Sequence, residues 1–163
     1  MYVPFNQLSD AARIWVYQAS RPLEQEEKAT MLQNLQEFLE QWTAHGNPLQ
    51  CSTEILYEQF LILAVEESLQ GATGCAVDAS VQFIRGLEQA FQVHLLHRDY
   101  IAFRRGETNF VVPLDQLKEK IQQGAILADM LTFDNTVTKK EELADRWLVR
   151  AEDSWLAKYF HRQ

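Results

Sequence analysis

Cys75 is the residue of this sequence whose type and context best suit chemistry. It follows Gly71 and Gly74 at the expected start of a helix, where the helix dipole lowers the pKa of a thiol and makes it more nucleophilic. Asp78 lies three residues further on and opposes that effect, while Ser80 can hydrogen-bond locally. A nucleophile also needs a base and an orienting group. Two interpretations therefore stay open, a reactive thiol and a small side chain packed at a helix start.

An apolar run ends in two acidic residues just before this segment. Phe60–Val65 is continuously apolar, which is typical of a strand covered on both faces, and Glu66-Glu67 follows it. The acidic pair is either the solvated end of a buried strand or the mouth of a pocket, because strand ends often line ligand sites. The candidate pocket residues are Glu66, Glu67, Gly71, Gly74, Cys75, Asp78 and Ser80.

The loop before Cys75 lacks the residues that bind a nucleotide. A phosphate-binding loop reads GxxxxGK[ST], because its Lys and hydroxyl meet the phosphates and Mg²⁺. Here Gly74 is followed by Cys75 and Ala76, and no Lys occurs from Gln59 to Gln82. We interpret Gly71 and Gly74 as turn residues that need permissive backbone angles, and we expect no cofactor.

His94 and His97 are available as bases, although nothing in the sequence brings them close to Cys75. Their spacing places them on opposite faces of a strand, so joint metal binding needs a turn between them. No further Cys or His completes a tetrahedral set nearby. We therefore expect no metal site.

The charge of the chain excludes several classes of partner. Lys and Arg number 15 and Asp and Glu 23, so the formal net charge is −8. Phosphate binding depends on clustered Lys and Arg, so neither nucleic acid nor an anionic membrane surface is an expected partner. The acidic excess lies in residues 1–100, with 5 basic and 13 acidic side chains, whereas residues 101–163 carry 10 of each.

Cysteine usage and the first residues predict a cytoplasmic protein. Cys51 and Cys75 cannot form a disulfide framework for a chain of 163 residues. Met1–Asn6 has neither the basic nor the apolar region of a signal peptide. The longest apolar run, Phe60–Val65, is too short to span a bilayer. A reducing cytoplasm is the predicted compartment.

Apolar periodicity predicts two long helices that flank these side chains. Apolar residues recur at three- and four-residue steps from Met31 to Trp42 and from Val77 to Phe91. The first helix should begin close behind Pro22, and Gly46 should end it. Short helices are expected over 117–121 and from Thr138, which has capping-box spacing with Glu141.

Strands are expected over 12–17, 51–57, 60–65, 93–96, 100–103, 109–112 and 130–133. Glu58-Gln59 is a poor hairpin turn, so one long bent strand over 51–65 is the alternative. The order begins as β-α-β-β-α-β, as in ferredoxin-like domains. It predicts an α+β fold, with a mainly antiparallel sheet, two amphipathic helices packed on it and short C-terminal helices. Residues 1–163 are interpreted as a single domain.

Aromatic residues gather in the C-terminal tail. Trp155 and Tyr159 are four residues apart, so they share one face of a helix. They either dock that helix onto the core or form the contact of a homo-oligomer.

Four segments carry a resemblance to a known family: Met1–Asn6, Arg13–Gln18, Gly74–Asp78 with Ser80-Val81, and Ser154-Trp155. They resemble an uncharacterised family of short cytosolic proteins, mainly from Bacteroidetes, whose members often carry the label "ABC transporter ATPase". This chain has no Walker A loop and no LSGGQ-like signature, and its one Walker-B-like strand precedes the Gly-containing loop. The resemblance implies a cytosolic location and transfers no catalytic residue, and we do not expect an ABC-type ATPase.

Three hypotheses follow for the function. The leading one is a non-catalytic domain that binds a small ligand or a protein partner, because no catalytic set is complete. The second is an enzyme that uses the Cys75 thiol, with Glu66, Glu67, Asp78 or a histidine as its partner. The third is a structural subunit of an oligomer, which the aromatic tail suggests.

Overall fold

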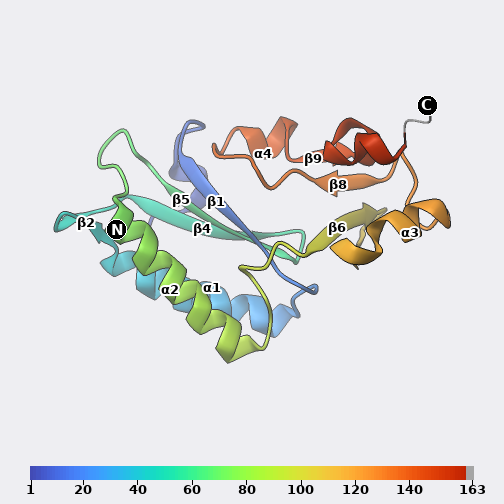
Figure 1. Ribbon diagram of the computed structural model, residues 1–163. Coiled ribbons are helices and arrows are strands. Elements are labelled where there is room, and N and C mark those ends of the chain that lie inside the picture. The colour runs from blue at the N-terminus through green and yellow to red at the C-terminus, as the bar shows by residue number, and fades with distance from the viewer. Residues whose placement is uncertain (161–163) are drawn as a thin grey trace.

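The computed structural model of the protein describes residues 1–160, which form two larger antiparallel sheets, a separate two-stranded hairpin, and helices packed on the sheets (Figure 1). The helices are α1 (Gln25–Gln41), α2 (Gly74–Phe91), α3 (Leu117–Gln122) and α4 (Glu142–Asp145). The strands are β1 (Arg13–Gln18), β2 (Thr43–Ala44), β3 (Asn47–Pro48), β4 (Cys51–Leu56), β5 (Phe60–Val65), β6 (Tyr100–Arg105), β7 (Thr108–Pro113), β8 (Leu131–Phe133) and β9 (Leu148–Arg150). Short 3-10 helices are η1 (Phe5–Gln7), η2 (Leu114–Gln116), η3 (Ala151–Asp153) and η4 (Trp155–Tyr159). The predicted α+β class is confirmed.

The first sheet has the strand order β1-β5-β4, and β5 is buried along its whole length. Its side chains alternate between two cores, as the twofold repeat of a strand requires. Leu61, Leu63 and Val65 face the core under the long helices, together with Leu35 of α1 and Ile84 of α2. Figure 1 shows α1 and α2 side by side on one face of this sheet.

The other side chains of β5 join the two halves of the chain. Phe60, Ile62 and Ala64 pack in a second core with Phe133 and Trp147, which come from the C-terminal part of the sequence. The rings of Phe60 and Phe133 are 4.2 Å apart and those of Phe60 and Trp147 5.0 Å, as centroid distances. Both faces of β5 are covered, which explains why its sequence is a continuous apolar run rather than an alternating one.

The first sheet matches three of the four strands of a ferredoxin-like sheet. β5 lies between β1 and β4 and runs antiparallel to both, as in a split β-α-β unit. The predicted order has segment 93–96 as the fourth strand, but this segment forms no strand, and the next strand along the chain, β6, pairs with β7 and β8. Within residues 1–160, the outer edge of β1 carries only an isolated bridge, between Arg13 and Lys139. The second sheet has the order β7-β6-β8-β9.

Several local predictions are corrected. Residues 93–96 form no strand, and Glu88 Oε2 accepts the Leu95 and Leu96 N–H groups instead, at 2.7 and 3.1 Å. Helix α1 ends at Gln41 rather than at Gly46. Gly46 instead lies in the turn of the β2–β3 hairpin, where its φ angle is 77°. Glu142, not Glu141, accepts the N–H groups of residues 138 and 139.

The β4–β5 connection is a tight turn rather than one bent strand. The Gln59 N–H donates to the Leu56 carbonyl over 3.2 Å, and Tyr57 and Glu58 both have positive φ angles, of 52° and 60°. The connection has three residues, 57–59, because Leu56 and Phe60 are paired, and positive φ angles in such a turn match the twist of the flanking strands. Along residues 1–160, no helix has the length and apolar character needed to cross a membrane.

Candidate functional site

Cys75 lies on the surface, at the second residue of α2. Thr73 caps this helix, because its hydroxyl oxygen accepts the Ala76 N–H at 3.2 Å. Cys75 is exposed and lines an open hollow of about 380 Å³ together with Trp42 and His45. His45 lies at the tip of the β2–β3 hairpin, so it is this histidine, and neither His94 nor His97, that shares the hollow with the thiol.

Glu66 and Glu67 hold the loop that leads to α2. Glu66 accepts hydrogen bonds from the hydroxyl groups of Ser9, at 2.8 Å, and Ser68, at 3.1 Å. Glu67 accepts the Ala72 N–H at 3.0 Å and lies 3.7 Å from the Arg13 guanidinium. Each carboxylate thus has partners that close the loop, and neither lines the hollow beside Cys75.

The remaining candidate residues point away from one another. Asp78 is exposed on α2, whereas Ser80 is buried and donates to the Val77 carbonyl at 2.6 Å. Burial raises the pKa of the nearby Tyr17, and a hydrogen bond with Ser80 partly offsets this rise. Gly71 and Gly74 lack the positive φ that their interpretation as turn residues required. Of the seven predicted pocket residues, Cys75 alone lines the hollow.

His94 and His97 come together at the far end of α2. The turn after the helix places their ring centroids 4.4 Å apart. Helix α2 has 18 residues, so its two ends are separated by about 27 Å. The part of the chain that the structure describes holds no group of three His, Cys, Asp or Glu residues placed to bind a metal ion.

The site that best unites distant parts of the chain is a cavity of about 390 Å³ between the two sheets, which we name the inter-sheet cleft. Its walls come from five segments: 16–18 of β1, 95–98 after α2, 100–102 of β6, 133–136 after β8, and Trp155 of η4. It lies at the outer edge of β1, on the side where a fourth ferredoxin-like strand would pair. Its volume falls within the range of about 300–1,000 Å³ that is usual for ligand sites.

A chain of side-chain hydrogen bonds crosses the inter-sheet cleft. Gln18 Nε2 donates to the Tyr100 carbonyl at 2.9 Å, and Gln18 Oε1 accepts from Asn135 Nδ2 at 3.0 Å. Asn135 Oδ1 in turn accepts the Trp147 indole N–H at 2.9 Å. Each amide uses both its donor and its acceptor, so this network fixes the distance between β1 and the second sheet.

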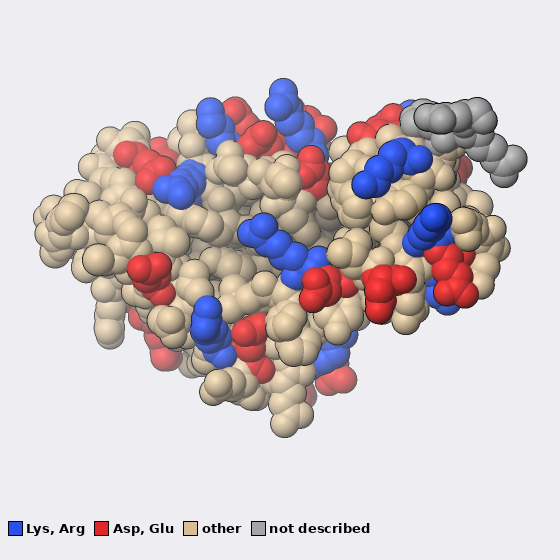
Figure 2. All heavy atoms as spheres, viewed as in Figure 1, with Lys and Arg blue, Asp and Glu red and all other residues tan. Residues whose placement is uncertain are grey.

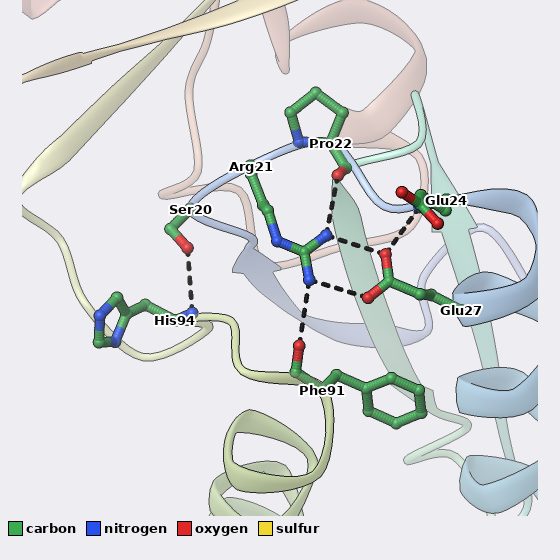
Figure 3. Close-up of polar contacts among 7 residues, drawn as sticks. All are labelled: Ser20, Arg21, Pro22, Glu24, Glu27, Phe91 and His94. Carbon is green, nitrogen blue, oxygen red and sulfur yellow. Dashed lines mark hydrogen bonds and ion pairs between the residues drawn. The ribbon is translucent and has the colours of Figure 1, made fainter.

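An ion pair holds the loop that forms one wall of the inter-sheet cleft (Figure 3). Arg21 donates to both carboxylate oxygens of Glu27 at 2.8 Å, and it also donates to the Phe91 carbonyl, at the end of α2, at 3.0 Å. Ser20 and His94 exchange two hydrogen bonds, of 2.9 and 3.0 Å. The Arg21 guanidinium and the Glu24 N–H lower the pKa of Glu27 to about 2.

Charged groups in the inter-sheet cleft keep some of their bonding capacity unused. Arg98 forms no ion pair or side-chain hydrogen bond within residues 1–160. Asp134 Oδ1 accepts the Thr136 N–H at 3.0 Å, whereas Oδ2 has no hydrogen bond within residues 1–160. Beside them lie the rings of Phe133 and Trp155, and Trp155 is 51% exposed. The cleft therefore offers a cation, an anion and aromatic surface together.

Sequence reasoning missed most of this site. The sequence predicts that Arg98 lies in a turn, and it predicts no functional role for Gln18 or Asn135. One signal was present, because Arg98 is one of only 5 basic residues before residue 101. Nothing local in the sequence indicates that β1 and the 133–136 segment meet.

Comparison with protein-family models, with curated proteins and with solved structures found no match to this chain.

Proposed function

We propose that this chain is a non-catalytic binding domain and that its ligand, a small organic molecule, enters the inter-sheet cleft. The observation that carries the proposal is Arg98, which lines a cavity between two sheets without an ion partner among residues 1–160. Few well-formed cavities with convergent polar groups occur in a protein, and they are the usual ligand sites.

The side chains around the cleft favour a small zwitterion with an apolar body, such as an aromatic amino acid or a dipeptide. Arg98 suits a carboxylate, because its guanidinium offers a fork of N–H donors. Asp134 has an oxygen available for an ammonium group. Phe133 and Trp155 offer ring surface, against which an apolar or aromatic side chain packs.

The cleft supports binding better than it supports a reaction. Covalent catalysis requires a nucleophile, a base and an orienting group within hydrogen-bond reach of one another. In the cleft, the Thr136 hydroxyl donates to Asp134, two residues before it, in a contact that closes a turn. The amides of Gln18 and Asn135 are engaged in holding the two sheets together.

A thermal-shift titration with aromatic amino acids and dipeptides tests the proposal, since a ligand that binds only the folded state raises its melting temperature. We expect a saturable rise for the wild type and for Arg85→Gln, a matched variant on the exposed face of α2. We expect Arg98→Gln to lose most of the rise. No rise with any of these ligands would contradict the proposed ligand class, and an unchanged rise in Arg98→Gln would contradict the site.

A thiol-dependent enzyme is the second candidate function. It is favoured by the exposure of Cys75 and by His45, which lines the same hollow and supplies an imidazole as base. Titration of the free thiols with an aromatic disulfide tests it. A reaction of Cys75 that is faster than that of a free thiol near neutral pH, and that slows in His45→Gln, would support this candidate. Equal rates would remove it.

The exposed ring of Trp155 leaves a third candidate, a subunit of a homo-oligomer. Light scattering at two protein concentrations tests it, because a contact through η4 would give a dimer that Trp155→Ala returns to a monomer. We also propose a reducing, cytoplasmic location and no nucleic-acid partner. An exposed free thiol is compatible with that compartment, and Figure 2 shows acidic and basic side chains interspersed over the visible face rather than one broad basic area.

A further inference from the structure

A second, larger hollow lies on the second sheet, away from the inter-sheet cleft. It measures about 640 Å³ and lies between β7, Lys120 of α3 and the loop at Ala125-Ile126. None of its residues lines the inter-sheet cleft. Because β7 is the edge strand of its sheet, the hollow opens along an edge that no other strand of residues 1–160 covers. We name it the β7 hollow.

The floor of the β7 hollow is apolar. Val112 and Ile126 are buried, and Phe110 is half-buried with its ring stacked 5.4 Å from that of Phe103. Ile126 belongs to a third core, a cluster of buried residues that also includes Phe103 and Val112, and Phe110 packs against this cluster. The floor of the hollow is therefore a continuation of that core. A rigid apolar floor of this kind accommodates an alkyl chain or a ring without reorganisation.

Two cations lie at the β7 hollow, and neither has an acidic partner in the described chain. Arg105 holds its guanidinium carbon 5.4 Å from the centroid of the Phe110 ring. Lys120 lines the hollow from α3. Two other cations of this half are paired, since Arg146 meets Glu142 at 3.9 Å and Arg150 meets Glu152 at 2.9 Å. The β7 hollow thus joins an apolar floor to an uncompensated positive charge.

We propose that the β7 hollow is a binding site for an amphipathic monocarboxylate, a medium-chain fatty acid. The alkyl chain lies on Phe110, Val112 and Ile126, and the carboxylate lies between Arg105 and Lys120. Burial of the CH₂ groups in an apolar site is favourable in transfer free energy, and the carboxylate supplies the negative charge that neither cation has as a partner. A polyanion fits poorly, because only two cations line the hollow and the chain carries a net charge of −8.

The experiment is a calorimetric titration of the full chain with decanoate below its micelle concentration, followed by amide chemical shifts of the ¹⁵N-labelled protein. We expect saturable binding of decanoate and shifts confined to residues around β7 and Ala125-Ile126. Decanol has the same alkyl chain without the charge, and we expect it to bind about tenfold more weakly, since a charge-assisted hydrogen bond is worth at least that factor.

Matched variants locate the site. The double variant Arg105→Gln, Lys120→Gln should weaken decanoate binding at least tenfold and leave decanol binding unchanged, whereas Lys118→Gln, an exposed lysine of the same helix that does not line the hollow, should bind as the wild type does. Ala125→Trp, which fills the hollow from an exposed position, should abolish the binding of both ligands while the melting temperature stays near that of the wild type. Arg98→Gln should bind decanoate normally, so this test is independent of the inter-sheet cleft.

Three results would overturn the proposal. One is the absence of saturable decanoate binding by the wild type. Another is an equal loss of affinity in Lys118→Gln and Lys120→Gln, which would indicate adsorption to positive charge anywhere on the surface. The third is normal decanoate binding by a folded Ala125→Trp variant, which would place the ligand elsewhere.

Discussion

The two sheets differ in what their charged side chains do. Around β1, β4 and β5, several charged groups close the structure, as Glu67 does for the loop before α2 and Arg21 with Glu27 for the two long helices. Around β6 and β7, Arg98, Arg105 and Lys120 line cavities and have no ion partner among residues 1–160. The acidic excess lies in the first region, where Glu37 and Glu54 line hollows without an ion partner among residues 1–160, whereas the cations without an ion partner line the cavities beside the second region. Net charge describes a solvated surface, whereas a site depends on the few charges that folding leaves unpaired.

The sharpest way to break this contrast is to find reactive chemistry in the first region. Cys51 is fully buried, and burial raises its pKa to about 11, which leaves about one thiolate in a thousand at pH 8. Cys75 is exposed. We therefore expect the Cys75 thiol to react at once and the buried Cys51 thiol far more slowly. Mass spectrometry of the labelled peptides at pH 8 identifies each thiol, and Cys75→Ser should remove the fast phase alone. Rapid labelling of Cys51 would contradict the packing of β4 against α1.

The second prediction concerns the joint between the two regions. Trp147 is 1% exposed, contacts Phe60 and Phe133 and donates to Asn135. Trp147→Ala leaves a large cavity between the sheets, so we expect the free energy of unfolding to fall by about 3–5 kcal/mol. Urea denaturation measures this. Trp155→Ala serves as the control, because that ring is half exposed and we expect a loss below about 1 kcal/mol. Equal losses in the two variants would mean that the sheets are not joined through Trp147.

The third prediction concerns acid stability in the first region. The pKa of Glu27 is about 2 in the folded protein, against an ordinary value of 4.5. Its ion pair therefore contributes fully above pH 4.5, and the contribution is lost as the pH falls from 4.5 towards 2. Because the Arg21 side chain is 41% exposed, solvent screens the pair, and we expect Glu27→Gln to cost about 1 kcal/mol at pH 7.

Melting curves between pH 2 and pH 7 test this assignment. The Glu27→Gln variant should lose less stability than the wild type when the pH falls from 4.5 to 2, since it has no carboxylate to protonate there. Glu26→Gln removes an exposed carboxylate from the same helical turn. It should keep the acid dependence of the wild type, and an identical flattening in both variants would assign the effect to the helix dipole instead of the ion pair.

The smallest effect is expected in the loop before α2. Glu66 accepts hydrogen bonds from the hydroxyl groups of Ser9 and Ser68, and both contacts are exposed to solvent. Glu66→Gln should therefore change the free energy of unfolding by less than about 0.5 kcal/mol. The same urea titration measures it. If Glu66→Gln instead altered ligand-induced thermal shifts, the acidic strand end would be part of a binding site after all.

The sequence predicts elements whose signal is local and repeated. Met31, Leu35 and Leu39 form one apolar stripe of α1 that faces the protein core. The apolar run of β5 is buried on both faces of its sheet. The segment 93–96 shows where such reasoning fails. Val93 and Leu95 are buried in alternation like strand residues, but Glu88 binds their backbone and no strand pairs with them. Burial periodicity reports which side chains face the core, and it does not report where the backbone hydrogen bonds go.

The candidate site is less predictable than the elements for a physical reason. The inter-sheet cleft gathers Gln18, Arg98, Asn135 and Trp155, which are far apart along the chain and share no periodicity. Their meeting depends on which strand pairs with β1, and β6 pairs with the second sheet instead. The predicted pocket residues from Glu66 to Ser80 are neighbours in sequence, and the helical and loop geometry that follows from that proximity turns them in different directions.

The position of β1 also shapes how the chain can fold. Its inner edge pairs with β5, which follows a long helix and three further strands, and its outer edge meets Lys139, more than a hundred residues along the sequence. Closing such long loops costs entropy before the contacts form, which slows folding. The β4–β5 hairpin and α1 are local and can form early, so β1 is expected to dock onto them later. The bridge to Lys139 would then close last, and during synthesis on a ribosome the edge of β1 would stay open until Lys139 had emerged.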